Sequence, residues 1–164
     1  MKSMRTDAGG HHPQALARPL RVFLSYARTD LDLALGLRDH LTADGVDAFL
    51  DVNDIVMGEP WQERLQKLIV SADTILFLIS PASVKSAYCD WEVDEAERLA
   101  KRIVPVVALP TVRGAIPGRL QRLNFAILDT PARWTAEYPR LLEALRLDAF
   151  WMREHTRLLE LGTR

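Results

Sequence analysis

The chain of 164 residues is long enough for one domain with a substantial core and too short for two domains of ordinary size. Its hydrophobic content of 48% and charged content of 26% are typical of a globular protein, and the formal net charge of -1 gives no electrostatic preference for nucleic acid or an anionic membrane. The one cysteine, Cys89, excludes an internal disulfide framework, and no apolar run is long enough to span a membrane. Because residues 1–19 lack the apolar segment of a secretory signal, we expect a cytoplasmic protein.

The first 19 residues differ from the rest of the chain in composition. They contain glycines, prolines and the pair His11-His12, with almost no periodic apolar pattern. Residues 1–19 are therefore predicted to form a flexible N-terminal tail. A metal site needs three or four ligands, and the histidine pair has no third ligand nearby in the sequence, so no metal site is predicted.

Beyond the tail, short apolar runs alternate with segments of helical periodicity. Leu20–Leu24 predicts the first strand, Thr29-Asp30 has the residue types of a helix cap, and Gly45 is typical of a helix end. Thr74–Ile79 is the most apolar run and predicts a central buried strand. The other predicted elements are strands at Val46–Leu50, Ile103–Leu109 and Phe125–Leu128, a helix opening at Pro60, a helix capped by Ser86 and a closing helix at Tyr138–Leu147.

This alternation predicts an α/β fold of the flavodoxin-like kind: a five-stranded parallel sheet with helices on both faces. Ligands of such folds bind above the carboxyl ends of the strands. The expected functional edge therefore comprises residues 25–28, 51–60 and 80–88 and the loop after Leu109.

Several chemistries that share this architecture lack their residues here. A response regulator needs an acidic pair after the first strand and an aspartate after the third, where this chain has Ser25-Tyr26 and Ser80-Pro81. A flavodoxin needs a Ser/Thr-rich phosphate loop after the first strand. No glycine-rich dinucleotide motif, P-loop or H-E-x-x-H motif occurs in the sequence.

The segment Ser86–Glu92 remains as a candidate for chemistry. Its helix must start at the ligand-binding edge, which places Glu92 one turn below Tyr88 and beside the buried stripe through Cys89. A carboxylate in that position can face a cleft. Acids early in a helix are also favoured by the helix dipole alone, so position leaves both interpretations open.

Several segments, in order along the chain, resemble the Toll/interleukin-1 receptor (TIR) family, specifically its bacterial NAD-consuming members. The signature Ser86-Ala87-Tyr88-Cys89-x-x-Glu92 is similar to the family's S-x-W-C-x-x-E helix motif. The other matching segments are Phe23-Leu24-Ser25-Tyr26 with Asp30, Phe49-Leu50-Asp51 with Ile55, Gly58 and Trp61, Phe77–Pro81 with Ser83, and Lys101–Val106.

The resemblance implies an NAD+ hydrolase that cleaves the bond between nicotinamide and ribose, yielding nicotinamide and ADP-ribose or a cyclic variant. It assigns the catalytic role to Glu92, with NAD+ as substrate and no cofactor. It further implies that substrate contacts come from residues near the two strand ends and the helix start. These residues are Tyr26, Ala27, Arg28, Trp61 and Tyr88. Arg28 would pair with a phosphate. The sequence is equally compatible with Arg28 as a solvated loop charge and with Trp61 as a core-packing residue.

The loop between the second strand and the following helix resembles the BB loop of the family. In this chain it comprises Asp54, Ile55, Val56, Met57 and Gly58, whose apolar side chains are poor solvent-facing residues. The resemblance implies self-association through this loop, into a homo-oligomer or filament. The chain departs from the family by carrying Tyr88 for tryptophan and an apolar residue just before Gly58. A non-catalytic TIR adaptor, or a virulence factor that imitates host TIR domains, remains an alternative.

The predicted TIR domain spans residues 20–149, and residues 150–164 form a helical extension. The extension resembles segments that join TIR domains to further modules in multidomain bacterial proteins, so we expect a sensor module beyond it and a role in bacterial defence signalling. A helix packed back on the domain is the alternative for this segment.

Overall fold

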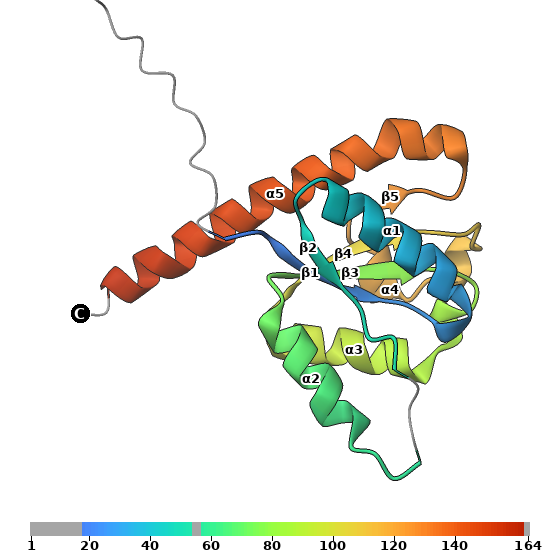
Figure 1. Ribbon diagram of the computed structural model, residues 1–164, viewed down its shortest axis with the longest axis horizontal. Helices are drawn as coiled ribbons and strands as arrows, with labels where there is room; N and C mark the ends of the chain where they lie inside the picture. The colour runs from blue at the N-terminus through green and yellow to red at the C-terminus, as the bar shows by residue number, and fades with distance from the viewer. Residues whose placement is uncertain (1–17, 54–56, 163–164) are drawn as a thin grey trace, which may run out of the picture.

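The computed structural model describes residues 18–53 and 57–162, with side chains described as far as Leu147. Its centre is a five-stranded sheet in the order β2-β1-β3-β4-β5, in which every strand pair is parallel. The strands are β1 (Arg21–Ser25), β2 (Asp47–Phe49), β3 (Thr74–Ile79), β4 (Arg102–Val107) and β5 (Ala126–Ile127). This arrangement confirms the flavodoxin-like fold class (Figure 1).

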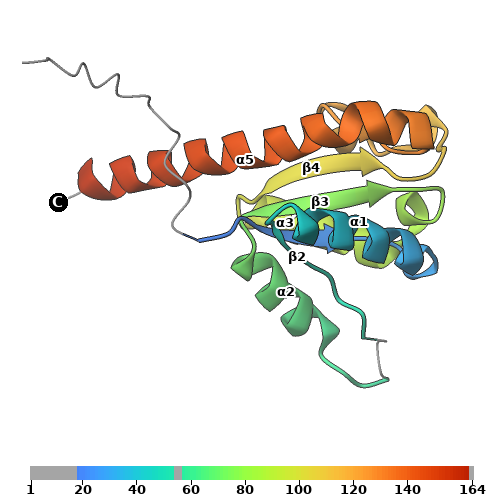
Figure 2. The same cartoon turned by 45° about the horizontal axis from the view of Figure 1, so that its top comes forward.

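Helices cover both faces of the sheet. One face packs against α1 (Leu31–Ala43) and α5 (Pro131–Gly162), and the other against α2 (Trp61–Ser71), α3 (Ala87–Arg98) and α4 (Gly118–Gln121). Figure 2 shows α2 on the side of the sheet away from α5. This layering follows from βαβ connections of one hand.

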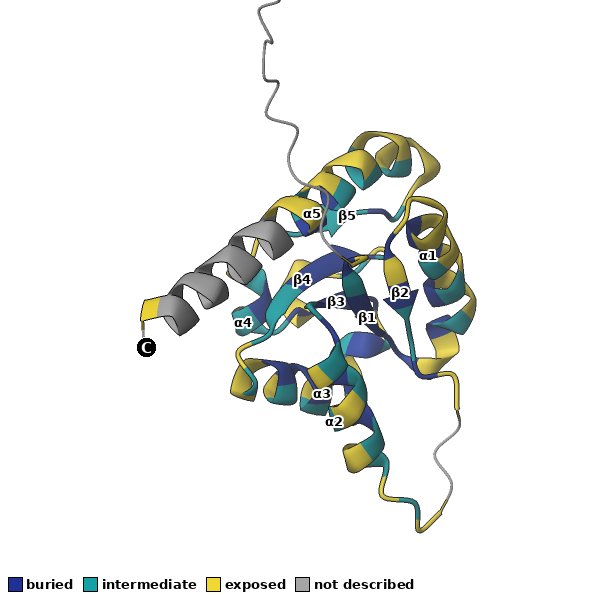
Figure 3. Cartoon of the chain, turned by 60° about the vertical axis from the view of Figure 1, so that its left-hand side comes forward, coloured by how far each residue is buried: buried dark blue, intermediate teal, exposed yellow. Residues whose placement is uncertain are grey.

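The strand sequences explain the two cores. In β1, Val22 and Leu24 pack towards α1 and α5, whereas Phe23 packs towards α2 and α3, because successive side chains of a strand point to opposite faces. All six residues of β3 are buried, as predicted for the central strand, since the strand is covered on both faces (Figure 3).

Several predicted boundaries were wrong by a few residues. The edge strands β2 and β5 are shorter than the apolar runs that predicted them, because each has a neighbouring strand on one side alone. The closing helix begins at Pro131 rather than Tyr138, and it continues through Pro139. The hydroxyl of Thr130 accepts a hydrogen bond from the Arg133 amide at 3.2 Å and so caps the true start.

The predicted helix ends were confirmed at two positions and corrected at a third. Gly45 follows α1 with φ of 84°, and the Ser86 hydroxyl caps α3 by accepting from the Cys89 amide at 3.2 Å. Asp30 stands at the start of α1, but its side chain makes no capping hydrogen bond. The carboxylate instead accepts a 2.5 Å hydrogen bond from the buried hydroxyl of Ser80, which ties the start of α1 to the end of β3.

The two ends of the described chain lie at the same side of the domain. Of the predicted tail, only Arg18 and Pro19 fall within the described residues, and Arg18 forms a 3.0 Å ion pair with Asp73. The helix α5 runs well past the sheet (Figure 1). No helix in the described part of the chain is long and apolar enough to cross a membrane.

Candidate functional site

Glu92 lies in the second turn of α3, at the carboxyl edge of the sheet. Its helix is anchored through Cys89, Val93 and Ala96, which are buried against the sheet. Glu92 follows this apolar stripe and is itself 6% exposed. The sequence prediction that this carboxylate is turned away from bulk water is consistent with that burial.

The electrostatic environment of Glu92 strongly favours its neutral form. Burial raises the pKa of the carboxyl group, and the charge of Asp51 also raises it; the resulting pKa is about 8, against an ordinary value of 4.5. The Ser25 hydroxyl and the charge of Arg28 act in the opposite direction and lower the pKa. Among the described residues, no donor lies within hydrogen-bonding geometry of Oε2 of Glu92. A buried carboxyl group with an unused oxygen is typical of functional sites.

A hydrogen-bonded cluster connects the end of β1 with Asp51, two residues after β2. The Tyr26 hydroxyl donates to the Asp51 carbonyl at 2.5 Å, and Nη1 of Arg28 donates to the same oxygen at 2.7 Å and to the Tyr26 hydroxyl at 3.1 Å. Burial raises the pKa of Tyr26, so its hydroxyl keeps the proton for this bond. The cluster holds Arg28 near Glu92 with 39% of the arginine side chain exposed.

Asp51 is the centre of a second set of contacts, which pins both ends of the BB loop. Its carboxylate is 5% exposed and accepts from Arg64 at 2.8 and 3.1 Å and from the Asn53 amide at 3.1 Å. Arg64 also pairs with Glu59 at the far end of the loop. The loop and the residues around Glu92 are therefore linked through a single buried aspartate.

A small cavity lies among these residues. It has a volume of about 30 Å³, which is room for about one water molecule. Its lining residues are Phe23, Leu24, Tyr26, Arg28, Asp51, Leu65, Ser86, Tyr88 and Glu92. Sites for drug-sized ligands have volumes of about 300–1,000 Å³, so this conformation is closed to a dinucleotide.

The two aromatic residues assigned to substrate lie together beside the cavity. Trp61 is the first residue of α2, and its ring meets Tyr88 edge-on at 4.8 Å and Trp91 at 5.2 Å. Trp61 is partly buried against the α2–α3 core, so it has a packing role, whereas Tyr88 is 42% exposed. Ala27 is buried, and its carbonyl accepts from the Asp30 amide. The structure thus brings together Tyr26, Arg28, Tyr88 and Glu92, and keeps Ala27 in a backbone role.

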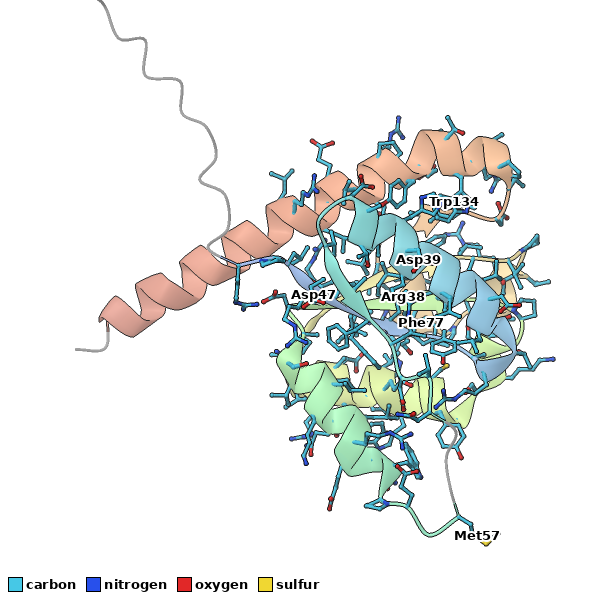
Figure 4. All side chains as sticks on the ribbon, viewed as in Figure 1. Arg38, Asp39, Asp47, Met57, Phe77 and Trp134 are labelled. Atoms are coloured by element: carbon cyan, nitrogen blue, oxygen red, sulfur yellow. The ribbon has the colours of Figure 1, made fainter. Side chains whose placement is uncertain are left out.

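The described part of the BB loop projects away from the domain. Met57 is fully exposed near the tip (Figure 4), and Gly58 has φ of 84°, a conformation that favours glycine. Asp54, Ile55 and Val56 lie outside the described residues.

Two larger hollows lie away from Glu92. One of about 710 Å³ runs between α5 and the β4–β5 edge and mixes arginine and glutamate side chains. The other, about 650 Å³, lies between α1 and α5 beside the ring cluster His40, Trp134 and Tyr138. Size alone does not identify a site. The second hollow includes Asp129, whose Oδ1 also lacks a hydrogen-bond partner among the described residues, but that carboxylate forms an ion pair with Arg133 at 3.6 Å. No group of three or more potential metal ligands occurs in the part of the chain that the structure describes.

Sequence reasoning missed three residues of this site as individual contributors: Ser25, Asp51 and Arg64. Ser25 and Asp51 lie within the predicted carboxyl edge, so the strand pattern could have indicated them. Arg64 had no signal, because an arginine in a surface helix is ordinarily solvated and its partner lies 13 positions away.

Comparison with known proteins agrees with the fold. The chain is similar to the TIR domain of the Toll-related receptor TRR-2 from Hydra magnipapillata, with 20% identity, a TM-score of 0.64, and coverage of 76% of this chain and 97% of that one. It is also similar to a metazoan TIR-STING receptor from C. gigas that was solved with 2',3'-cGAMP, with 24% identity and a TM-score of 0.61, covering 76% of this chain and 38% of that receptor. No curated protein matches the chain.

These likenesses concern the fold, and the family is shown by a separate match. The sequence model described as TIR domain matches residues 22–142, which is most of the chain and contains Glu92 and all five strands except the first residue of β1. The chain belongs to the TIR domain family.

Proposed function

We propose that the chain is an NAD+ hydrolase of the bacterial TIR type, which cleaves the nicotinamide–ribose bond with Glu92 as its catalytic residue. The observation that carries this proposal is the Glu92 carboxyl group: it is buried at the carboxyl edge of the sheet with one oxygen unpartnered among the described residues. It also stands at the glutamate of the family's helix signature.

The reaction needs little from the protein beyond a placed negative charge. The bond between the ribose anomeric carbon and the pyridinium nitrogen breaks, and its electron pair leaves with neutral nicotinamide, so no general acid is required. Positive charge develops on the ribose, as in glycoside cleavage. An ionised Glu92 beside that carbon stabilises the charge in a site of low dielectric. Water then adds and releases a proton to give ADP-ribose, or an adenine nitrogen adds to give a cyclic product.

The protonation state of Glu92 is compatible with this role once substrate is bound. In the free protein, with a pKa of about 8, the group is mostly neutral at pH 7. The pyridinium of NAD+ brings a positive charge into the same cavity, which favours the ionised carboxylate. Substrate binding therefore generates the charged form that the reaction uses.

Arg28 and Tyr88 supply the remaining contacts in this proposal. Arg28 lines the cavity with 39% of its side chain exposed and is suited to bind the diphosphate. Tyr88 is an exposed ring one turn before Glu92 and offers a face for nicotinamide. Tyr26 holds Arg28 in place through its hydroxyl.

The closed cavity implies an activation step. A dinucleotide requires movement of the BB loop, which is tied to the site through Asp51. We propose that self-association into a homo-oligomer or filament supplies that movement, with Met57 in the contact. In this proposal the protein acts in the cytoplasm in bacterial defence signalling, and residues 150–164 connect the domain to a sensor module.

A non-catalytic interaction module is the second candidate. The fully exposed Met57 on a projecting loop favours it, because Met57 follows Ile55 and Val56 in the sequence, and a run of apolar residues in a loop suits a protein contact. The adaptor function needs the loop and not Glu92, so the two candidates separate in a single experiment.

The test is NAD+ consumption by concentrated purified protein, with Glu92→Ala and Glu92→Gln beside the wild type. Glu97→Gln serves as the matched control, because Glu97 lies on the same helix with its side chain 51% exposed. We expect both Glu92 variants to lose on the order of a hundredfold or more in turnover and Glu97→Gln to keep it. No consumption even after forced clustering would refute the hydrolase and leave the interaction module.

A further inference from the structure

Ser25 is the last residue of β1, and its side chain is fully buried. Val22 and Leu24 point towards α1 and α5, whereas Phe23 points towards α2 and α3. Because strand side chains alternate, Ser25 shares the side of Phe23. Its hydroxyl therefore faces the layer that carries Glu92.

Two buried polar atoms lie in this region without partners. Within the described residues, neither Oγ of Ser25 nor Oε2 of Glu92 has a hydrogen bond of strict geometry, and both are shielded from solvent. Unpartnered buried polar atoms are destabilising, so a neighbouring pair of them calls for a functional explanation. A serine hydroxyl rotates freely and can donate as soon as an acceptor becomes charged.

We propose that Ser25 is a positioning residue for Glu92, whose hydroxyl donates to the carboxylate when that group is ionised and so holds it towards the reacting carbon. This role rests on the proposed function, but the contact itself does not depend on catalysis. The hydroxyl stabilises the charged form of Glu92 more than the neutral form, because a hydrogen bond to an ionised carboxylate is stronger than one to a neutral carboxyl group.

The other groups facing Glu92 act differently. Arg28 favours the ionised form through its charge, and Asp51 opposes it. The Tyr26 hydroxyl is committed to the Asp51 carbonyl, and burial raises the pKa of the Cys89 thiol to about 11. Ser25 is thus a neutral group that acts on Glu92, and removing it leaves every formal charge in place.

The test is urea unfolding of wild type and Ser25→Ala between pH 5 and pH 10. Ser25→Ala should change stability by a constant amount at low pH, where Glu92 is protonated, and cause an added loss above pH 8. The midpoint of the pH dependence should rise by roughly one unit. Thr74→Val is the matched control: Thr74 on β3 is also buried, and its hydroxyl has no hydrogen-bond partner among the described residues, but it pairs with Val22 at the opposite end of the sheet. Its effect should be equal at every pH.

Urea unfolding with and without Ser25→Ala, repeated in a Glu92→Gln background, tests whether Glu92 is the partner of the Ser25 hydroxyl. The pH-dependent part of the Ser25→Ala effect should vanish there. A constant effect across pH, or a pH dependence that survives in Glu92→Gln, would overturn the proposal. Because unfolding needs no NAD+, a chain without hydrolase activity would refute the proposed function and still report on Ser25. In an active chain the pH profile of kcat/KM should move upwards with the unfolding midpoint, and an unmoved profile would count against Ser25.

Discussion

Glu92→Gln should be more stable than the wild type, and the difference in the free energy of unfolding should grow as the pH rises. The pKa of this carboxyl group is about 8 in the folded chain, against an ordinary value of 4.5. Below about pH 4.5, Glu92 is protonated in both states and contributes no pH dependence. Between the two values the unfolded chain ionises and the folded chain does not, so the wild type loses stability as pH rises. Above the folded pKa this loss is complete.

The size of the effect follows from the shift. A change from 4.5 to about 8 corresponds to on the order of 4–5 kcal/mol, at about 1.4 kcal/mol per unit. Most of it develops between pH 5 and pH 9. Domains of this size have free energies of unfolding of about 5–15 kcal/mol, so the burial of this one ionisable group lowers the stability by a large fraction of the total at high pH. Glutamine does not titrate and avoids this loss.

The assay is urea unfolding followed by tryptophan fluorescence at a series of pH values. Wild type and Glu92→Gln should have similar stability near pH 5 and diverge steadily up to about pH 8, with the variant more stable. Glu97→Gln removes an exposed carboxylate from the same helix and should follow the wild type. Parallel curves for wild type and Glu92→Gln would refute the reasoning, since they would show that Glu92 is not desolvated in solution.

Three further predictions test the surroundings of this site. Asp51→Asn should lower the free energy of unfolding by on the order of 2–4 kcal/mol in urea melts, because Arg64 then lacks the charge of a buried partner. In steady-state assays of NAD+ cleavage, kcat/KM should rise with pH, with a midpoint near 8, the pKa of Glu92 in the free protein. A fall of kcat/KM with pH would instead indicate that Glu92 acts as an acid. Met57→Asp should reduce self-association in light scattering, whereas Val112→Asp, another exposed apolar position (78% exposed), should not.

The fold was predictable because its signals are local. The apolar run Thr74–Ile79 matches β3 residue for residue, and Gly45 and Ser86 mark helix boundaries through their own backbone and side-chain chemistry. The alternation of these elements then leaves few topologies. Errors occurred where local rules conflict with packing. The closing helix was predicted to begin at Tyr138, yet α5 begins at Pro131 and passes through Pro139, with Leu141 and Leu145 buried against the sheet.

The position of Glu92 on its helix was also readable from the sequence, since helical spacing relative to Cys89 orients it. Its pKa was not, because desolvation depends on every neighbour that excludes water. Asp51 likewise has a position that the sequence predicts and contacts that only the folded structure reveals. Its place after β2 follows from the strand pattern, but Arg28 and Arg64 reach it from 23 and 13 positions away. Periodicity and caps are properties of adjacent residues and determined the elements, whereas the charge state of the site arises from contacts that exist only once the sheet and α3 are packed together.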